Sequence, residues 1–412
     1  DEEPVLVLFQ LWLEKYKRVN GLTFGSVLVN TASGDGSAAE CRSYFTAGPK
    51  TKGLAGGSLG FMFRPSITPT VVVLLSVFAG GVAHASGPFD FSATLRVDLH
   101  HVGDASKEVF MLDELRREGA WPGSRTNLLD TSGFGTTLVE VSAAAGDSAV
   151  LFSSGHCSLF HEWRTTNQAK ATSRVFSESV RMPMPRAPVR LTVKVRNGKG
   201  RMVPVFTTTI DPASVEVNRE RRGGGLRTHR IHGTHDPATS LDIVVLGDGY
   251  EQWQLPKYRA DVARFMEVLL AAEPFARHKG QINIWAVESP SRQSGVDEPR
   301  KGVYRDTALS MGFNTFGSAR YLMTEANKAV RDVAANAPYD AIFIMANTSR
   351  YGGGGIYNLY ASFVADNEYD EYVLVHEFGH SFAGLGDEYY SSDVAYNDMY
   401  PRGVEPWEPN IT

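Results

Sequence analysis

Two stretches of the chain alternate strictly between apolar and polar residues. In residues 91–99 and 189–196 the apolar side chains occupy every second position. That period places one face of a β-strand on a core and the other face in water. Shorter segments of the same kind lie at residues 138–141, 149–153 and 202–207. With the Gly-, Pro-, Asp- and Asn-rich turns between them, these strands predict an all-β sandwich over residues 86–215.

From about residue 237 the hydrophobic pattern changes. The run 243–246 is apolar at every position, which suits a strand buried on both faces, and Pro256 can open a helix after it. The apolar stripe of that helix has i, i+3, i+4, i+7 spacing: Val262, Phe265, Met266 and Leu269. Three further elements follow by the same criteria: strands over 282–287 and 341–345, and between them a helix with Leu322, Ala326, Val330 and Val333 on its apolar side. Alternating strands and helices predict an α/β domain over residues 237–412, joined to the sandwich by a linker at 216–236.

Another apolar run lies near the start of the chain, at residues 71–83. It is too short to span a bilayer, which takes about 20 residues. It follows Met62-Phe63-Arg64, a start residue with a basic flank, and ends in the small-x-small sequence Ala83-His84-Ala85. These features predict a signal peptide over residues 62–85, and therefore a secreted or periplasmic protein that begins at Ser86.

Residues 1–61 precede that signal, and the chain does not begin with Met. We interpret them as a spurious upstream extension, so that synthesis starts at Met62. Cys41 would then be absent from the mature protein, and Cys157 would be a lone thiol that acts as a small buried hydrophobe. Two cysteines support neither a disulfide framework nor a cysteine-based zinc site.

Composition and charge are those of an ordinary globular protein and narrow the possible functions only slightly. The formal net charge is −5, and hydrophobic and charged residues make up 42 % and 21 % of the chain, as in ordinary globular domains. This charge gives no reason to expect a nucleic-acid partner. The most basic stretch, residues 219–225, is glycine-rich and typical of a solvated linker. Nothing in the sequence predicts stable membrane insertion or fixes the oligomeric state.

The last predicted helix carries the chemistry. Asp370 can cap its start, and its packed side consists of Val373, Leu374, Phe378 and Phe382. On this helix His376 and His380 lie one turn apart, so their imidazoles point the same way, about 6 Å apart along the axis. An edge strand is expected just before the helix, over Asn358 to Ala365.

That spacing lets His376 and His380 bind one tetrahedral zinc ion (Zn²⁺) at about 2.0–2.1 Å each. Glu377 can then act as general base on a metal-bound water. The competing interpretation is two surface histidines on an ordinary helix. It is weaker because the motif lies mid-helix, after an α/β layer, in a chain with an export signal.

A catalytic zinc ion usually has three protein ligands and one open position. Asp387 and Glu388 follow Gly384-Leu385-Gly386, where glycines can end the helix and turn the chain back toward the metal. Asp387 is the favoured third ligand and Glu388 the alternative. Both carboxylates could instead support the ligands or form ion pairs.

Several motifs together resemble the bacterial immunoglobulin-A-peptidase family of zinc metallopeptidases. The resemblance covers about residues 88–400. The motifs of the catalytic unit are residues 376–390, 246–250, 288–291 and 351–358, and residues 160–166 resemble the β domain that precedes it. The resemblance implies a metzincin-like zincin fold, zinc-dependent endopeptidase activity, His376 and His380 as ligands, and Glu377 as catalyst. It does not imply that immunoglobulin A is cleaved, and Gly384 and Asp387 both lie one residue later than the metzincin pattern places them.

The sequence thus predicts an α+β multidomain protein, an all-β sandwich followed by a zincin-like catalytic domain. The leading function is a secreted zinc-dependent endopeptidase that hydrolyses protein or peptide substrates through a metal-activated water. One alternative is a non-catalytic surface- or glycan-binding protein with a relic zincin domain, against which the intact His376, Glu377 and His380 argue. The other is a zinc amidase acting on cell-wall peptides.

The catalytic domain is expected to be incomplete at its C-terminus. Metzincin-type domains continue past the third ligand into a subdomain that forms the floor beneath the metal. Here the prolines in residues 400–409 exclude a long helix. We therefore expect the natural protein to continue beyond residue 412.

Overall fold

The computed structural model describes residues 87–146, 149–220, 224–387, 400 and 403–411. The predicted signal peptide, Cys41 and Glu388 lie outside these described residues. Within them, no helix combines the length and the apolar character that crossing a membrane requires.

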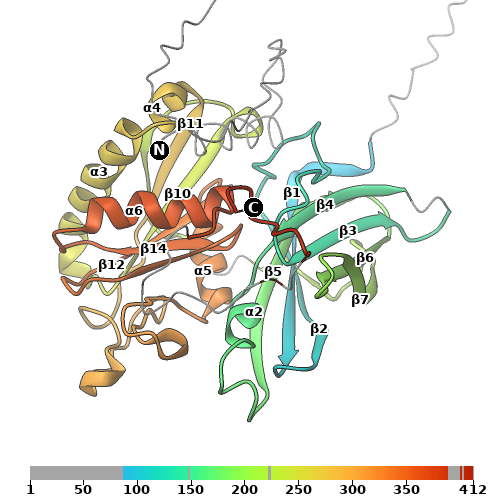
Figure 1. The fold of residues 1–412 in the computed structure, drawn as a ribbon. Coiled ribbons are helices and arrows are strands. Elements are labelled where there is room, and N and C mark those ends of the chain that lie inside the picture. The colour runs from blue at the N-terminus through green and yellow to red at the C-terminus, as the bar shows by residue number, and fades with distance from the viewer. Residues whose placement is uncertain (1–86, 147–148, 221–223, 388–399, 401–402, 412) are drawn as a thin grey trace, which may run out of the picture. The chain divides into compact units, whose positions relative to one another are not determined.

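The N-terminal domain is built from two four-stranded sheets (Figure 1). The first has the order β5-β1-β2-β8: Arg174–Pro185, Phe89–Gly103, Glu108–Glu118 and Val217–Asn218. The second has the order β4-β3-β6-β7: Val150–His156, Thr137–Ala143, Val189–Arg196 and Met202–Ile210. Apolar residues of both sheets form one core, which confirms the predicted all-β sandwich.

The two strictly alternating stretches behave differently. In β6, Val189, Leu191, Val193 and Val195 are buried and the residues between them are not, as predicted. In β1 the polar residues Thr94, Arg96 and Asp98 are buried as well, while Ser92 is exposed, so the prediction of a solvated face was wrong for most of that strand. Arg96 is fully buried and lies 2.9 Å from Glu118 and 2.8 Å from Asp332 of the C-terminal domain. On the second face of β1, Arg96 is therefore buried in ion pairs instead of being exposed to water.

The C-terminal domain contains a six-stranded sheet with the order β13-β14-β12-β10-β11-β9. In that order the strands are Gly353–Ile356, Tyr360–Val364, Ala341–Ala346, Leu241–Asp248, Ile282–Val287 and Thr228–His232. The four inner strands are parallel to one another, and the two edge strands, β13 and β9, are antiparallel to their neighbours. An α/β domain therefore follows the β domain, as the sequence predicted.

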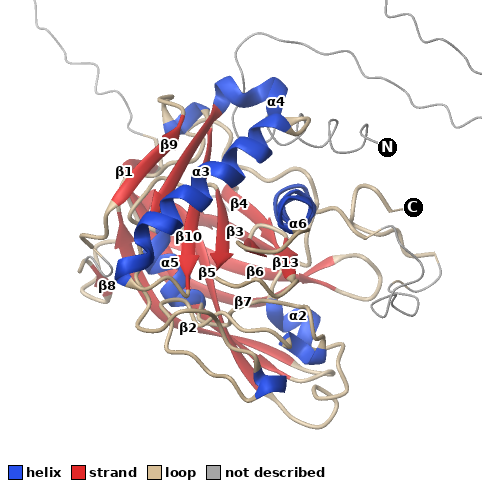
Figure 2. Ribbon diagram, turned by 90° about the vertical axis from the view of Figure 1, so that its left-hand side faces the viewer, coloured by secondary structure: helices blue, strands red, loops and turns tan. Residues whose placement is uncertain are grey.

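Helices cover both faces of this sheet (Figure 2). One face packs against α3 (Leu255–Ala271), α4 (Phe275–His278) and α6 (Asp370–Phe378). The other face packs against α5 (Asn327–Ala334) and against α2 (Leu159–Trp163), which belongs to the N-terminal domain. Single 3₁₀ turns occupy Pro237–Thr239, Gln252–Gln254, Lys279–Gln281, Pro299–Lys301 and Thr315–Gly317. The N-terminal domain thus contributes directly to the core of the C-terminal domain.

Three predicted elements differ from the structure. The strand expected at the sheet edge, β14, is an inner strand, and the glycine-rich β13 is the edge. The helix expected to include Leu322 begins only at Asn327, because the Leu322 N–H donates to the Gly353 carbonyl instead. The segment expected to be a linker contains β8 and β9, and His232 of β9 contacts the Lys279 carbonyl at 2.9 Å.

Two single-residue expectations had different outcomes. Asp370 does not cap α6: Tyr369 is the N-cap residue, and the Asp370 carboxylate lies 3.3 Å from Arg264. Cys157 is buried, and desolvation raises the pKa of its thiol to about 12. It therefore behaves as the small buried hydrophobe that was predicted.

Candidate metal centre

The helix that carries the predicted site changes its winding within the motif. The α-helical part, α6, ends at Phe378 and continues directly as a π-helical segment, η6 (Gly379–Ala383). Such π turns occur frequently at functional sites. The predicted packed side, Val373, Leu374, Phe378 and Phe382, is buried in the domain core. The opposite side of the helix is left to present polar residues.

Three predicted ligands come together beside this helix. The Nε2 atoms of His376 and His380 are 3.1 Å apart, and Asp387 Oδ1 lies 3.3 Å from the first and 3.2 Å from the second. Donors bound tetrahedrally at 2.0–2.1 Å from one ion lie about 3.3–3.4 Å apart. Two imidazole nitrogens and a carboxylate oxygen at these separations fit one divalent ion.

One ligand has its orientation fixed by the backbone. The Nδ1 of His380 donates to the Leu385 carbonyl at 2.5 Å, so in the neutral imidazole the lone pair is on Nε2, the atom that lies beside the other two donors. Gly384 makes this contact possible, because it has φ +70° and ends the helix in the left-handed region. The predicted glycine turn therefore delivers Asp387 to the two histidines.

Residues 403–411 contact the turn and stabilise its position. Asn410 accepts a hydrogen bond from the Gly386 N–H at 2.8 Å and donates one to the Gly386 carbonyl at 2.9 Å. Trp407 packs on Tyr357 with ring centroids 5.7 Å apart. Residues 403–411 contain no helix, as expected, and these contacts hold the turn that precedes Asp387.

The edge strand β13 lies directly against α6 and η6. A Cβ atom on Gly353 would lie 3.1 Å from Glu377 Cγ, and one on Gly355 would lie 2.9 Å from His380 Cβ. On the other face of the strand, a Cβ on Gly354 would collide with the ring of Tyr321. The glycine run is therefore a tightly packed rim beside the centre rather than a loop.

The predicted general base, Glu377, is half-buried beside the two histidines. Burial raises the pKa of its carboxyl, Asp387 raises it further, and His380 and His376 oppose the rise. A carboxylate with a raised pKa next to a metal centre suits proton transfer near neutral pH.

The N-terminal domain contributes a second carboxylate to these surroundings. Glu162 of α2 accepts a hydrogen bond from the Tyr321 hydroxyl, and its charge interacts with those of His380 and Glu377. Burial raises the pKa of Glu162 to about 7. Sequence reasoning assigned no role to either residue, since only the motif at residues 160–166 drew attention to this helix.

A mixed sheet with an antiparallel edge strand, followed by a helix carrying two histidines and a glutamate, defines a zincin-like hydrolase domain. Residues 230–412 match the family described as IgA Peptidase M64, and residues 88–207 match its N-terminal domain, Peptidase M64 N-terminus. No curated protein matches the chain. The chain belongs to the IgA peptidase M64 family, as the resemblance implied, and it is a peptidase of the hydrolase class.

Proposed function

We propose that this chain is a zinc-dependent endopeptidase in which His376, His380 and Asp387 hold the metal and Glu377 is the general base. The observation that carries the proposal is the convergence of the three donor atoms, 3.1–3.3 Å apart, next to Glu377. Two nitrogens and one oxygen suit zinc, and three protein ligands leave the open position of a catalytic site.

A zinc ion at such a site lowers the pKa of water and polarises a carbonyl. The remaining steps belong to the chain. Glu377 takes a proton from the attacking water and passes it to the leaving amine, and its burial raises its affinity for that proton. The contact between His380 and Leu385 keeps the imidazole in one tautomer throughout.

An extended polypeptide is the substrate that suits this centre. The edge strand β13 lies beside Glu377, and a sheet edge can bind a peptide by strand addition. Residues 320–322 cover one end of the edge, where the Gly353 N–H donates to the Arg320 carbonyl at 3.3 Å. A peptide that binds along the rest of β13 would place peptide bonds from the interior of its chain next to Glu377. Cleavage of interior bonds is what defines an endopeptidase.

Export completes the proposal. The sequence of residues 62–85 supports secretion or release into the periplasm, with Ser86 as the first residue of the mature protein. Intact-mass analysis of the exported protein tests this. A species that retains residues 1–61 would contradict it.

The activity is tested by incubating the purified chain with a protein mixture and, separately, with peptidoglycan. Each incubation is repeated with a chelator and again after zinc is restored. We expect new internal cleavage products from the protein mixture only, lost with chelator and regained with zinc. Release of cell-wall peptides alone would favour an amidase, and no cleavage of either substrate by zinc-loaded protein would favour a relic binding protein.

A further inference from the structure

A second group of histidines and carboxylates lies in the N-terminal domain. His101 is on β1, Glu108 begins β2, and His161 is on α2. The register pairs Gly103 with Glu108, so His101 and Glu108 point to the same face of the sheet because side chains alternate along a strand. α2 supplies His161 to that face.

Both histidines direct the same ring atom at one oxygen. The Nε2 of His101 is 3.1 Å from Glu108 Oε2, and the Nε2 of His161 is 3.2 Å from it. These separations match those between the histidines and Asp387 in the catalytic centre, 3.3 and 3.2 Å. In the part of the chain that the structure describes, only these two groups bring three such donor atoms together.

Each of the three side chains also has a second polar partner, which contacts an atom other than the shared donor atoms. His101 Nδ1 lies 2.6 Å from Glu178 Oε1, and His161 Nδ1 lies 2.9 Å from the Thr136 hydroxyl. Arg164 donates to the other oxygen of Glu108 at 2.8 Å. Metal-binding histidines and carboxylates typically have such outer partners, which fix the tautomer and orient the donor atom.

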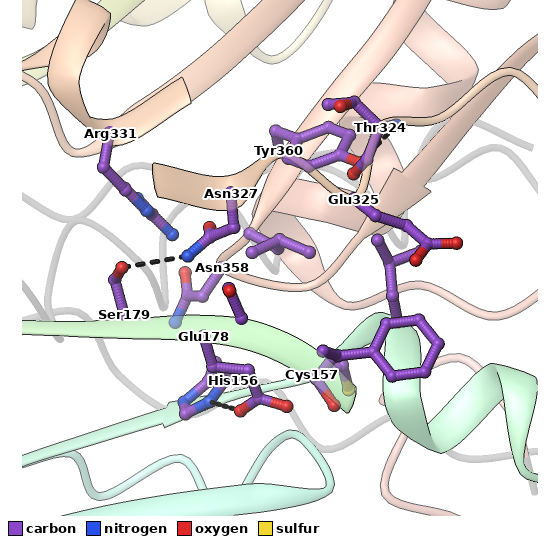
Figure 3. Close-up of a pocket in the computed structure, with 15 residues that line it drawn as sticks. His156, Cys157, Glu178, Ser179, Thr324, Glu325, Asn327, Arg331, Asn358 and Tyr360 are labelled. Atoms are coloured by element: carbon purple, nitrogen blue, oxygen red, sulfur yellow. Dashed lines mark hydrogen bonds and ion pairs between the residues drawn. The ribbon is translucent and has the colours of Figure 1, made fainter. Parts of the chain in front are cut away.

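The outer partner of His101 is itself anchored. Glu178 is approached by His156 at 3.5 Å on its other oxygen, at the wall of a cavity (Figure 3). The His101 ring is fixed as well, stacked between Phe110 and Phe160 with centroids 3.9 and 3.8 Å away. The donor atom of His101 therefore has little freedom to leave the cluster.

From this arrangement we propose that His101, Glu108 and His161 bind a second divalent metal ion. Two nitrogens and one oxygen suit zinc or a similar borderline cation. The side chains of His101, Glu108 and His161 are 0 %, 15 % and 13 % exposed, so the site is closed to a polypeptide substrate and its role is structural. It would tie α2 to the β1–β2 hairpin.

The metal-bound and metal-free forms of the cluster differ in where the imidazole protons lie. Without a metal, His101 must be protonated on both nitrogens to serve Glu178 and Glu108, and His161 must donate to the same Glu108 oxygen. With a metal, each imidazole needs one proton, on Nδ1, donated to Glu178 and to Thr136. The lone pairs on both Nε2 atoms then face the cation, as in carboxylate–histidine–zinc arrangements.

The test is a count of zinc ions per full-length chain after dialysis against buffered zinc, measured by elemental analysis. We expect two ions in the wild type and one in the variant His376→Ala/His380→Ala, which lacks the catalytic ligands. His161→Ala should lose one ion, and Glu108→Gln provides the same test if that variant folds poorly. The control His235→Ala, which removes a histidine outside both clusters, should keep two.

One zinc ion in the wild type and none in His376→Ala/His380→Ala would overturn the second site while leaving the catalytic proposal intact. Two ions that persist in folded His161→Ala and Glu108→Gln would also overturn it, because the extra ion would lie elsewhere. One ion in the wild type that persists in His376→Ala/His380→Ala would instead overturn the proposed catalytic centre. The proposed function and the second site thus fail on different measurements.

Discussion

The proposed catalytic centre and the N-terminal cluster collect similar donor atoms by different means. His376, His380 and Asp387 come from one helix and the turn after it, and their side chains are 28 %, 18 % and 35 % exposed. The N-terminal cluster draws on two strands and a separate helix, and its side chains are nearly buried. Three partly exposed donors can be reached by a substrate, whereas three nearly buried donors can only stabilise the fold. Similar donor atoms therefore support different roles.

The largest contrast is expected from removing a ligand of the exposed centre. Asp387→Ala takes away one of three donors, so metal occupancy there should collapse and activity should fall by roughly 10²-fold or more. Unfolding free energy should change little, because Asp387 is partly exposed. Elemental analysis and peptide-cleavage rates check this. Glu388→Ala is the matched control, and a greater loss of metal from that variant would transfer the ligand role to Glu388.

The buried cluster should respond in the opposite way. Glu178→Gln replaces a 6 %-exposed carboxylate that lies 2.6 Å from His101, and losing a hydrogen bond to a buried charged group costs about 1.5–3 kcal/mol of unfolding free energy. Urea denaturation measures the loss. The same substitution at Glu325, whose exposed carboxylate pairs with Arg174, should cost under about 1 kcal/mol. Equal losses of unfolding free energy in Glu178→Gln and Glu325→Gln would contradict a structural role for the buried cluster.

A smaller effect should appear where the two regions meet. α2 carries both His161 and Glu162, and Glu162 accepts a hydrogen bond from Tyr321 beneath the rim strand β13. Tyr321→Phe removes that donor from a buried carboxylate, so the rim should shift and kcat/KM should fall about tenfold, or about 1.4 kcal/mol. Glu162→Gln keeps an acceptor for Tyr321 and should lose less. An unchanged kcat/KM in Tyr321→Phe, with normal zinc content, would show that the contact between α2 and Tyr321 does not influence catalysis.

The same contrast explains what could be predicted from the sequence. The spacing of His376 and His380 is a local property of a helix, and the alternation in residues 189–196 is a local property of a strand, so both were predicted. The glycine turn before Asp387 is also local. These features cover the fold class and the residues expected to hold the metal.

The features that were missed depend on contacts between distant segments. Whether β13 or β14 is the edge strand follows from sheet order, which neither strand encodes alone. The buried face of β1 depends on Asp332 of α5 approaching Arg96. His101 and His161 meet only because α2 docks on the sheet, and the same docking brings Glu162 to Tyr321. No spacing along the chain signals these encounters.

One measurement tests the account most directly: turnover and zinc content of Glu377→Gln beside the wild type. The substitution keeps the size of the side chain and leaves the three donor atoms in place, but it removes the base. The account predicts that the variant binds as much zinc as the wild type and cleaves peptides at least about 10²-fold more slowly. Near-normal cleavage by the zinc-loaded variant would contradict Glu377 as the base and, with it, the proposed peptidase mechanism.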